Sequence, residues 1–325
     1  MISLVQLGAL DYATGLRLQE KLVALRKENK IGDVLLLLEH APVITLGRNA
    51  KAANIIASPE LLTQRGVQLF DTDRGGDVTF HGPGQIVGYP IFDLRGYARD
   101  LGNDHVGTAA PGRPGERRST LRKHLGAVDF VRRLEEVLIR TCADFTIPTK
   151  RVPGLTGVWT DATGNADHAG TPASAVQRSE ASAAEHDREG HDLSRAEKSP
   201  DKELALAAEA RSPEAKLAAI GIHISRFVTS HGFALNVNPD LSFFKLIIPC
   251  GITAKPVTSM QQQLGKPLDL NAVAESISRN FGTVFSSQML WVDSLEALLG
   301  ETFGVPMKPP AELRQLRKED DTTWA

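Results

Sequence analysis

The sequence lacks the features on which secreted, thiol-metal and membrane proteins depend. Only 2 of its 325 residues are cysteine, too few for a disulfide framework or a cluster of metal-binding thiols. The longest apolar run, residues 34–38, has the length of a strand, whereas a membrane-spanning helix needs about 20 apolar residues. No basic stretch precedes the first apolar residues, as a secretory signal would require. We therefore expect a cytoplasmic protein without bound metal or membrane contact.

An excess of charge of one sign is also lacking. The net charge is −2 at pH 7 and the isoelectric point is about 6.5, so electrostatics give no reason to expect a nucleic-acid partner. Hydrophobic residues make up 42% of the chain, which is enough for a sizeable buried core. Composition alone indicates a globular enzyme or binding domain.

Two segments differ in composition from the rest of the chain. Residues 96–120 are rich in glycine and arginine without apolar periodicity, and residues 160–212 contain no aromatic residue and few large aliphatic ones. Such segments bury too little apolar surface to offset the entropy lost on ordering. We expect both to be disordered surface insertions in a single domain that spans residues 1–295 and is followed by an extension, residues 296–325.

Hydrophobic periodicity and capping residues predict a mixture of helices and strands. Helices are expected over residues 11–29, 58–62, 124–145, 271–285 and 294–299, and strands over 34–38, 43–46, 85–92 and 289–292. Apolar residues alternate over 220–225 and 233–238, which predicts an antiparallel hairpin whose turn is formed by residues 229–232. Hairpins without a regular strand–helix repeat favour an α+β fold.

The two cysteines have different surroundings in the sequence. Cys250 follows a proline and precedes a glycine whose N–H is free to face an oxyanion, so it is either a buried structural thiol or an exposed nucleophile. Cys142 lies on the apolar face of an expected helix, and we expect it in the core. Lys216 starts an expected strand and is either solvated or, if the fold brings it near Cys250, the group that favours the thiolate.

The run from Arg74 to Gln85 contains four glycines around an arginine and a histidine. Backbone that closely lines a bound chain explains these glycines better than a simple connection does, so the run is interpreted as a ligand-binding loop. It matches neither the dinucleotide fingerprint nor the phosphate-binding loop. His81 and His231, each beside a glycine at an expected turn, are candidate imidazole partners for the thiol, and His40 is expected to be structural or to line a pocket.

Four motifs together resemble one family. They are HAPVITLGR (residues 40–48), RGGDVTFHGPGQ (74–85), KLAAIG (216–221) and HGFALN (231–236), the last leading to the sequence PCGI at 249–252. In this order they closely resemble the bacterial octanoyltransferases of lipoate biosynthesis, of the biotin/lipoate protein ligase-like superfamily. The resemblance covers most of residues 1–95 and 121–286. It implies a single α+β domain with a mixed, largely antiparallel sheet flanked by helices.

The resemblance also implies the roles of individual residues. Cys250 is expected to form the acyl thioester, and Lys216 is expected to lower the pKa of its thiol. Contacts with the acyl chain are expected from Arg74, Gly75, Gly76, Asp77, Val78, Thr79, Phe80, His81, Ala219, Ile220, Gly221, Gly232, Phe233 and Ala234.

The implied reaction moves an octanoyl group from octanoyl-acyl carrier protein to a lysine of lipoyl domains, without a cofactor. The expected acceptors are the lipoyl domains of 2-oxoacid dehydrogenase complexes and the H protein of glycine cleavage, and the enzyme is expected to be a monomer. Two alternatives remain open at this point. An ATP-dependent lipoate or biotin ligase on the same fold needs a lysine but no thiol, and a non-catalytic domain that binds carrier proteins needs neither.

Overall fold

The computed structural model describes residues 1–97, 124–160, 214–249 and 255–299. The expected insertions fall almost entirely outside these ranges, as does the greater part of the expected extension, residues 296–325. Gly96, Tyr97 and Thr160, at the borders of the expected insertions, lie within the described fold, where the Tyr97 hydroxyl donates to Asp33 Oδ2 at 2.6 Å.

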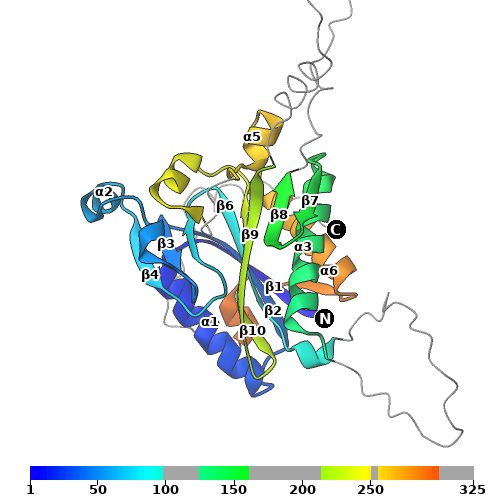
Figure 1. Cartoon of the computed structure of the whole chain (residues 1–325). Helices are drawn as coiled ribbons and strands as arrows, with labels where there is room; N and C mark the ends of the chain where they lie inside the picture. The colour runs from blue at the N-terminus through cyan, green and yellow to red at the C-terminus, as the bar shows by residue number, and fades with distance from the viewer. Residues whose placement is uncertain (98–123, 161–213, 250–254, 300–325) are drawn as a thin grey trace, which may run out of the picture.

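Within the described residues, eight strands form one sheet (Figure 1). In spatial order they are β11 (Met289–Trp291), β1 (Ile2–Leu10), β2 (Asp33–His40), β6 (Gln85–Ile91), β10 (Val228–Asn236), β9 (Lys216–Ser225), β8 (Leu155–Thr160) and β7 (Thr149–Val152). The pairs β11–β1 and β1–β2 are parallel and the remaining neighbours are antiparallel. The predicted mixed, largely antiparallel sheet is confirmed.

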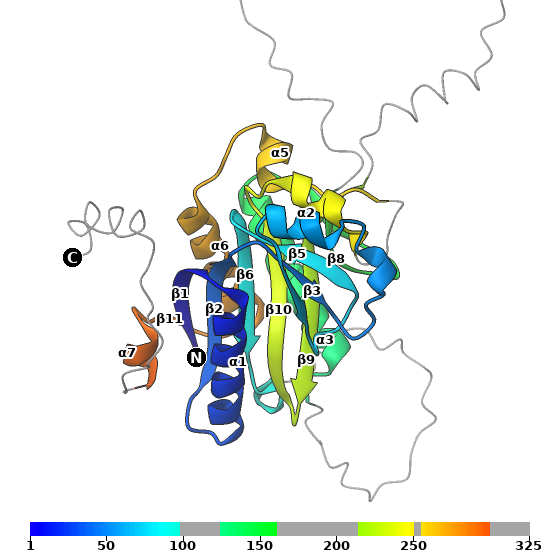
Figure 2. The same cartoon turned by 90° about the vertical axis from the view of Figure 1, so that its left-hand side faces the viewer.

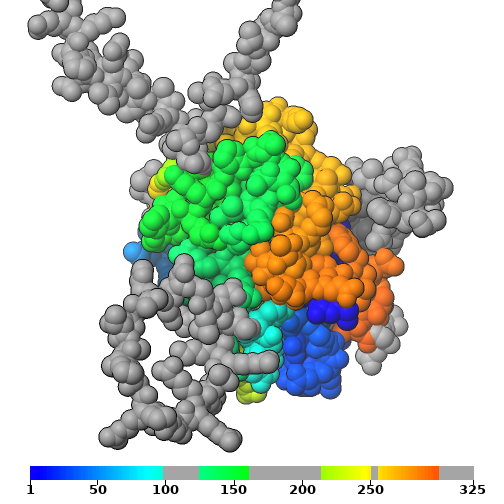
Figure 3. All heavy atoms as spheres, turned by 90° about the vertical axis from the view of Figure 1, so that its right-hand side faces the viewer, coloured from blue at the N-terminus to red at the C-terminus, as the bar shows by residue number. Residues whose placement is uncertain are grey.

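Helices cover both faces of this sheet, because each strand at its centre is apolar on both sides. On one face, α1 (Tyr12–Lys27) packs Leu18 and Leu22 against β2, β6 and β10 (Figure 2). On the other face, α3 (Ala127–Asp144) and α6 (Leu270–Val284) lie side by side (Figure 3). Their apolar sides enclose the larger core cluster, which includes the fully buried Phe130, Phe281 and Cys142. The expectation that Cys142 belongs to the core is confirmed.

A second, three-stranded sheet lies beside the first one. Its central strand β3 (Val43–Leu46) pairs with β4 (Gln68–Asp71) and β5 (Val78–His81). Short helical segments complete this region and the remainder of the described fold: η1 (Ala52–Asn54), α2 (Pro59–Gln64), η2 (Leu94–Gly96), η3 (Leu241–Leu246), α5 (Met260–Leu264) and α7 (Leu295–Leu299). None of the helices in the described ranges is long and apolar enough to cross a membrane.

The predicted hairpin is confirmed as β9 and β10, but the predicted turn at residues 229–232 is wrong. Those residues lie in β10 and pair with residues 221–224 of β9. The chain turns instead at Arg226 and Phe227, whose φ angles are 51° and 69°, as a two-residue hairpin loop requires. Glycine or asparagine usually supplies this conformation, so the sequence contains no signal for the turn.

Local capping signals predicted helix starts correctly, whereas several strands were missed. Asp11 Oδ1 accepts a hydrogen bond from Thr14 N–H at 2.9 Å, and Ser58 Oγ accepts one from Leu61 N–H at 3.3 Å. The strands β1, β4, β5, β7 and β8 were not expected. Most of them are short, and all except β7, which forms a hairpin with β8, pair with strands far away in the sequence.

Phe281 lies at the centre of the larger core, so we expect its truncation to be costly. Its ring centroid lies 5.4 Å from that of Phe285 and 6.1 Å from those of Phe92 and Phe233. Phe281→Ala should lower the free energy of unfolding, measured with urea, by about 3–5 kcal/mol. The matched control Val128→Ala removes an apolar side chain that is 71% exposed and should change it by less than about 0.5 kcal/mol. Similar losses in both variants would contradict this description of the core.

Candidate active site

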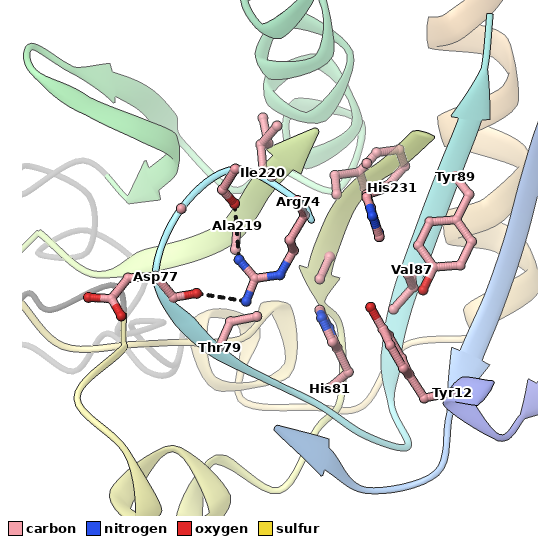
Figure 4. Close-up of a pocket in the computed structure, with 16 residues that line it drawn as sticks. Tyr12, Arg74, Asp77, Thr79, His81, Val87, Tyr89, Ala219, Ile220 and His231 are labelled. Atoms are coloured by element: carbon pink, nitrogen blue, oxygen red, sulfur yellow. Dashed lines mark hydrogen bonds between the residues drawn. The ribbon is translucent and has the colours of Figure 1, made fainter. Parts of the chain in front are cut away.

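A pocket lies where the three-stranded sheet covers β6, β9 and β10 of the larger sheet (Figure 4). Twelve of the fourteen residues for which the family resemblance implies acyl contact line this pocket. They are Arg74, Gly75, Gly76, Asp77, Thr79, His81, Ala219, Ile220, Gly221, Gly232, Phe233 and Ala234. Three segments that are far apart in the sequence therefore meet at one cavity.

The remaining two, Val78 and Phe80, point away from the pocket. The expected ligand loop is partly a strand, because residues 78–81 form β5, and successive side chains of a strand point to opposite faces. Val78 and Phe80 are buried in the core of the smaller sheet, where Phe80 stacks on Phe243 with ring centroids 4.8 Å apart. Acyl contact by these two residues stays a prediction.

The buried guanidinium of Arg74 holds the loop at residues 74–77 in place. Its Nη2 donates to the Thr45 carbonyl and the Asp77 carbonyl, both at 2.7 Å, and to Thr45 Oγ1 at 2.9 Å. The N–H of the next residue, Gly75, donates to the Ile222 carbonyl of β9 at 3.0 Å. The loop is thus fixed to both sheets.

Glycine is required where this loop crosses β9. A Cβ atom on Gly221 would lie 2.7 Å from the Gly75 carbonyl oxygen, closer than real Cβ contacts. Gly76 has a φ of 92°, a conformation that L side chains rarely adopt. The close approach seen here is between the loop and β9, so the interpretation that the glycines of residues 74–85 line a bound chain stays a prediction.

Buried histidines and tyrosines lie in and behind the deeper part of the site without adding charge. Burial lowers the pKa of His40 to about 4 and that of His81 to about 3, so both are neutral at pH 7. Nδ1 of His40 lies 3.0 Å from the Leu10 carbonyl and must donate to it, which leaves Nε2 to accept from the Tyr89 hydroxyl at 2.6 Å. His40 is therefore a structural support behind the pocket, one of the two roles expected for it.

His231 lines the pocket from β10 rather than from a turn, which corrects its predicted position. Its φ is 56°, a strained conformation for a residue in a strand. Its Nε2 lies 2.6 Å from Asp73 Oδ1, and burial lowers the pKa of its imidazole. The strain and the carboxylate partner together orient this imidazole at the pocket.

Sequence analysis did not assign four further lining residues to the pocket. They are Tyr12, Val87, Tyr89 and His231. Val87 and Tyr89 lie on the same face of the predicted strand 85–92, because Gly88 separates them. Pairing of this strand with residues 233–236 would have placed both side chains at the pocket. Tyr12 had no such signal, because it begins a helix whose docking position depends on the whole sheet.

Lys216 opens β9 as predicted and is buried, three residues before Ala219 of the pocket lining. Its ammonium lies 4.8 Å from the ring centroid of Trp159, the residue opposite it on β8, and the ring face of an indole favours a cation. Glycine at 157 lets β8 approach β9 beside this lysine, since a Cβ there would lie 2.4 Å from the Ala218 carbonyl oxygen. Cys250 lies outside the described residues, so its proximity to Lys216 stays a prediction.

Comparison with known proteins identifies the family. The model of the lipoyl protein ligase A/B catalytic domain matches residues 11–106 and 119–282. The chain belongs to this family. An octanoyltransferase of Koribacter versatilis is 48% identical over 98% of both chains, and one of Acidobacterium capsulatum is 44% identical over 93% of this chain and 97% of its own. This member of the lipoyl protein ligase A/B family is therefore an acyltransferase.

Solved structures of the lipoyl protein ligase family share its fold. A bi-partite lipoate protein ligase from Thermoplasma acidophilum has a TM-score of 0.54 and 11% identity, covering 92% of this chain and 90% of its own. Lipoate-protein ligase A bound with ATP has a TM-score of 0.50 and 10% identity over 90% and 89%. Such low identities show the fold alone, and they confirm the predicted lipoate ligase-like α+β domain.

The buried His40 predicts how stability depends on pH. Between about pH 6.5 and 4 the unfolded chain binds a proton on this residue that the folded chain does not bind. The free energy of unfolding should fall on acidification through this window, by at most about 3 kcal/mol from this group. His40→Gln cannot titrate, so its urea stability should fall less between pH 7 and pH 5. The exposed His124→Gln should retain the wild-type slope, and a wild-type slope in His40→Gln would refute the assignment.

Proposed function

We propose that the chain transfers an octanoyl group from octanoyl-acyl carrier protein to a lysine of lipoyl domains, through a thioester on Cys250. Octanoyl transfer in protein lipoylation rests on octanoyltransferase relatives at 44–48% identity over almost the whole chain. The observation that supports acyl binding is the pocket itself, whose lining combines small apolar side chains with the neutral imidazole of His81 and with Arg74, whose guanidinium bonds the carbonyls of Thr45 and Asp77. A pocket of this kind suits an uncharged aliphatic chain.

Described residues on both sides of Cys250 are fixed to the site. Ile248 N–H donates to the Asn54 carbonyl at 2.7 Å, and Asn54 Nδ2 donates to Asp77 Oδ2, beside the pocket, at 2.6 Å. On the other side, the Pro256 carbonyl accepts from Lys216 N–H at 2.8 Å. These anchors support a thiol between the pocket and Lys216.

In the first step, the Cys250 thiolate attacks the carbonyl carbon of the carrier-bound thioester. A carbon–sulfur bond to Cys250 forms, the bond to the carrier sulfur breaks, and the carrier thiolate takes up a proton. Lys216 accepts the Cys250 proton before attack and returns it to the leaving thiolate. The oxyanion requires backbone N–H donors, for which Gly251 is the candidate.

In the second step, the amine of the acceptor lysine attacks the acyl group on Cys250. The new bond is an amide, the Cys250 thiolate leaves, and Lys216 takes the proton that the amine releases. Thioester exchange is nearly neutral in free energy and amide formation from a thioester is downhill, so the reaction needs no ATP. The proposed acceptors are the lipoyl domains of 2-oxoacid dehydrogenase complexes and the H protein of glycine cleavage.

Replacement of the two cysteines should have opposite outcomes. Cys250→Ala should abolish octanoyl transfer and the octanoyl adduct seen by intact mass after incubation with octanoyl-carrier protein. Cys142→Ala should retain nearly full activity, because this thiol is fully buried in the core and burial raises its pKa to about 12. An active Cys250→Ala variant would refute the thioester and favour an ATP-dependent ligase, which addition of ATP and free octanoate would reveal.

Replacement of Lys216 separates its charge from its function as a base. Lys216→Ala should move the pH midpoint of Cys250 alkylation upward by about one unit or more. Lys216→Arg keeps the charge but cannot accept a proton at neutral pH, so it should preserve part of the thiolate while transferring octanoyl slowly. Lys245→Ala, on an exposed side chain of η3, is the control. An alkylation profile of Lys216→Ala that overlays the wild type would reject the pairing.

A further inference from the structure

A row of small apolar side chains crosses the floor of the pocket at right angles to the strands. Ala219 of β9 pairs with Ala234 of β10, which pairs with Val87 of β6, and all three line the pocket. The row therefore leads from the strand that Lys216 opens toward β6. Neighbouring strands lie about 4.8 Å apart, so the distance from β9 to β6 is about 10 Å.

At its β6 end, the row meets His81. Gln85 Nε2 donates to the Phe80 carbonyl at 3.1 Å and to Asn236 Oδ1 at 2.8 Å, which leaves Gln85 Oε1 to accept from His81 Nδ1 at 3.0 Å. His81 Nδ1 therefore holds the proton and Nε2 holds a lone pair. Because the imidazole is neutral and points into the pocket (Figure 4), Nε2 is a hydrogen-bond acceptor there.

Tyr12 closes the same end. It is 2% exposed, and its ring packs on His40 and Phe70 at centroid distances of 5.0 and 5.1 Å and stacks on His81 at 6.4 Å. Figure 4 shows Tyr12 and His81 entering the pocket from one side, with His231 opposite. Among the residues that the structure describes, none hydrogen-bonds the Tyr12 hydroxyl, and burial keeps this group protonated by raising its pKa to about 12.

We infer that Tyr12 and His81 form a polar stop that limits the acyl chain to about eight carbons, an inference that rests on the proposed function. At about 1.3 Å of advance per carbon–carbon bond, an extended octanoyl group is about 9 Å long. With its carbonyl at the β9 end of the row, over Ala219, it spans the row Ala219–Ala234–Val87 and ends at the polar stop. Each longer chain would press methylene groups against a hydroxyl and an imidazole nitrogen that then lose their hydrogen bonds to water.

The loss of such hydrogen bonds is large enough to select chain length. Leaving one buried polar group without a partner disfavours the longer chain on the order of tenfold. The same polar stop favours a chain whose terminal atom is a hydroxyl over an equally long chain that ends in a methyl group. Polarity, rather than space alone, therefore distinguishes the substrates.

The test compares Tyr12→Phe with the wild type on four acyl-carrier proteins. Tyr12→Phe removes one oxygen and leaves the ring in place, so the measured quantities are ratios of kcat/KM between substrates rather than the rate on octanoyl alone. The ratio of kcat/KM for dodecanoyl to that for octanoyl should rise about tenfold. The preference of the wild type for 8-hydroxyoctanoyl over nonanoyl, which have the same length, should fall by a similar factor. Unchanged ratios in Tyr12→Phe would overturn the inference.

Tyr97→Phe is the matched control, since it removes a tyrosine hydroxyl that is bonded to Asp33 outside the pocket. It should leave both ratios at their wild-type values, and a shift equal to that of Tyr12→Phe would overturn the polar stop. Equilibrium binding of the same carriers to Cys250→Ala gives both ratios without chemistry. Suppose that the wild type forms no thioester, while Cys250→Ala still binds the octanoyl carrier more tightly than the dodecanoyl carrier. This result would refute the mechanism and support the polar stop, so failure of the one is distinguishable from failure of the other.

Discussion

The buried guanidinium of Arg74 is the group on which the geometry of the site depends. It donates to carbonyl oxygens of Thr45 and Asp77, while the N–H of Gly75 bonds Ile222 of β9. A buried charge is tolerated only where its donors are satisfied, because an unpaired one costs several kcal/mol. If the loop left the smaller sheet, the buried guanidinium would lose its hydrogen-bond acceptors. The hydrogen bonds of Arg74 therefore fix the distance between the two sheets at the pocket.

The direction of the pocket follows from the register of the larger sheet. Small side chains at the same level of β9, β10 and β6 leave a path across the strands, where larger ones would fill it. Gly88 and Gly232 allow the strands to approach closely beside this path, since a Cβ on Gly232 would lie 2.0 Å from the Gly88 carbonyl oxygen. The pairing register therefore determines both the stability of the sheet centre and the shape of the ligand site.

Local patterns were readable from the sequence, whereas contacts between distant segments were not. The alternation of residues 220–225 correctly predicted which face of the hairpin packs in the core, and Asp11 correctly predicted a helix start. The turn was misplaced because Arg226 and Phe227 adopt positive φ without glycine. Tyr12 was missed because its place in the site depends on how α1 docks on the sheet. The family resemblance predicted that the pocket segments belong to one site. The residues alone were compatible with more than one function.

Residues of one sequence motif need not lie on the same face of a strand. Val78 and Phe80 belong to the same run as the pocket-lining residues, yet they face the core of the smaller sheet. There Phe80 packs against Phe243 and Phe244 of η3, the segment that leads directly to residues 247–248 and their bonds with η1. The strand β5 thus lines the pocket with one face and contacts the segment before Cys250 with the other. One short strand therefore links the pocket to the chain that leads to the proposed nucleophile.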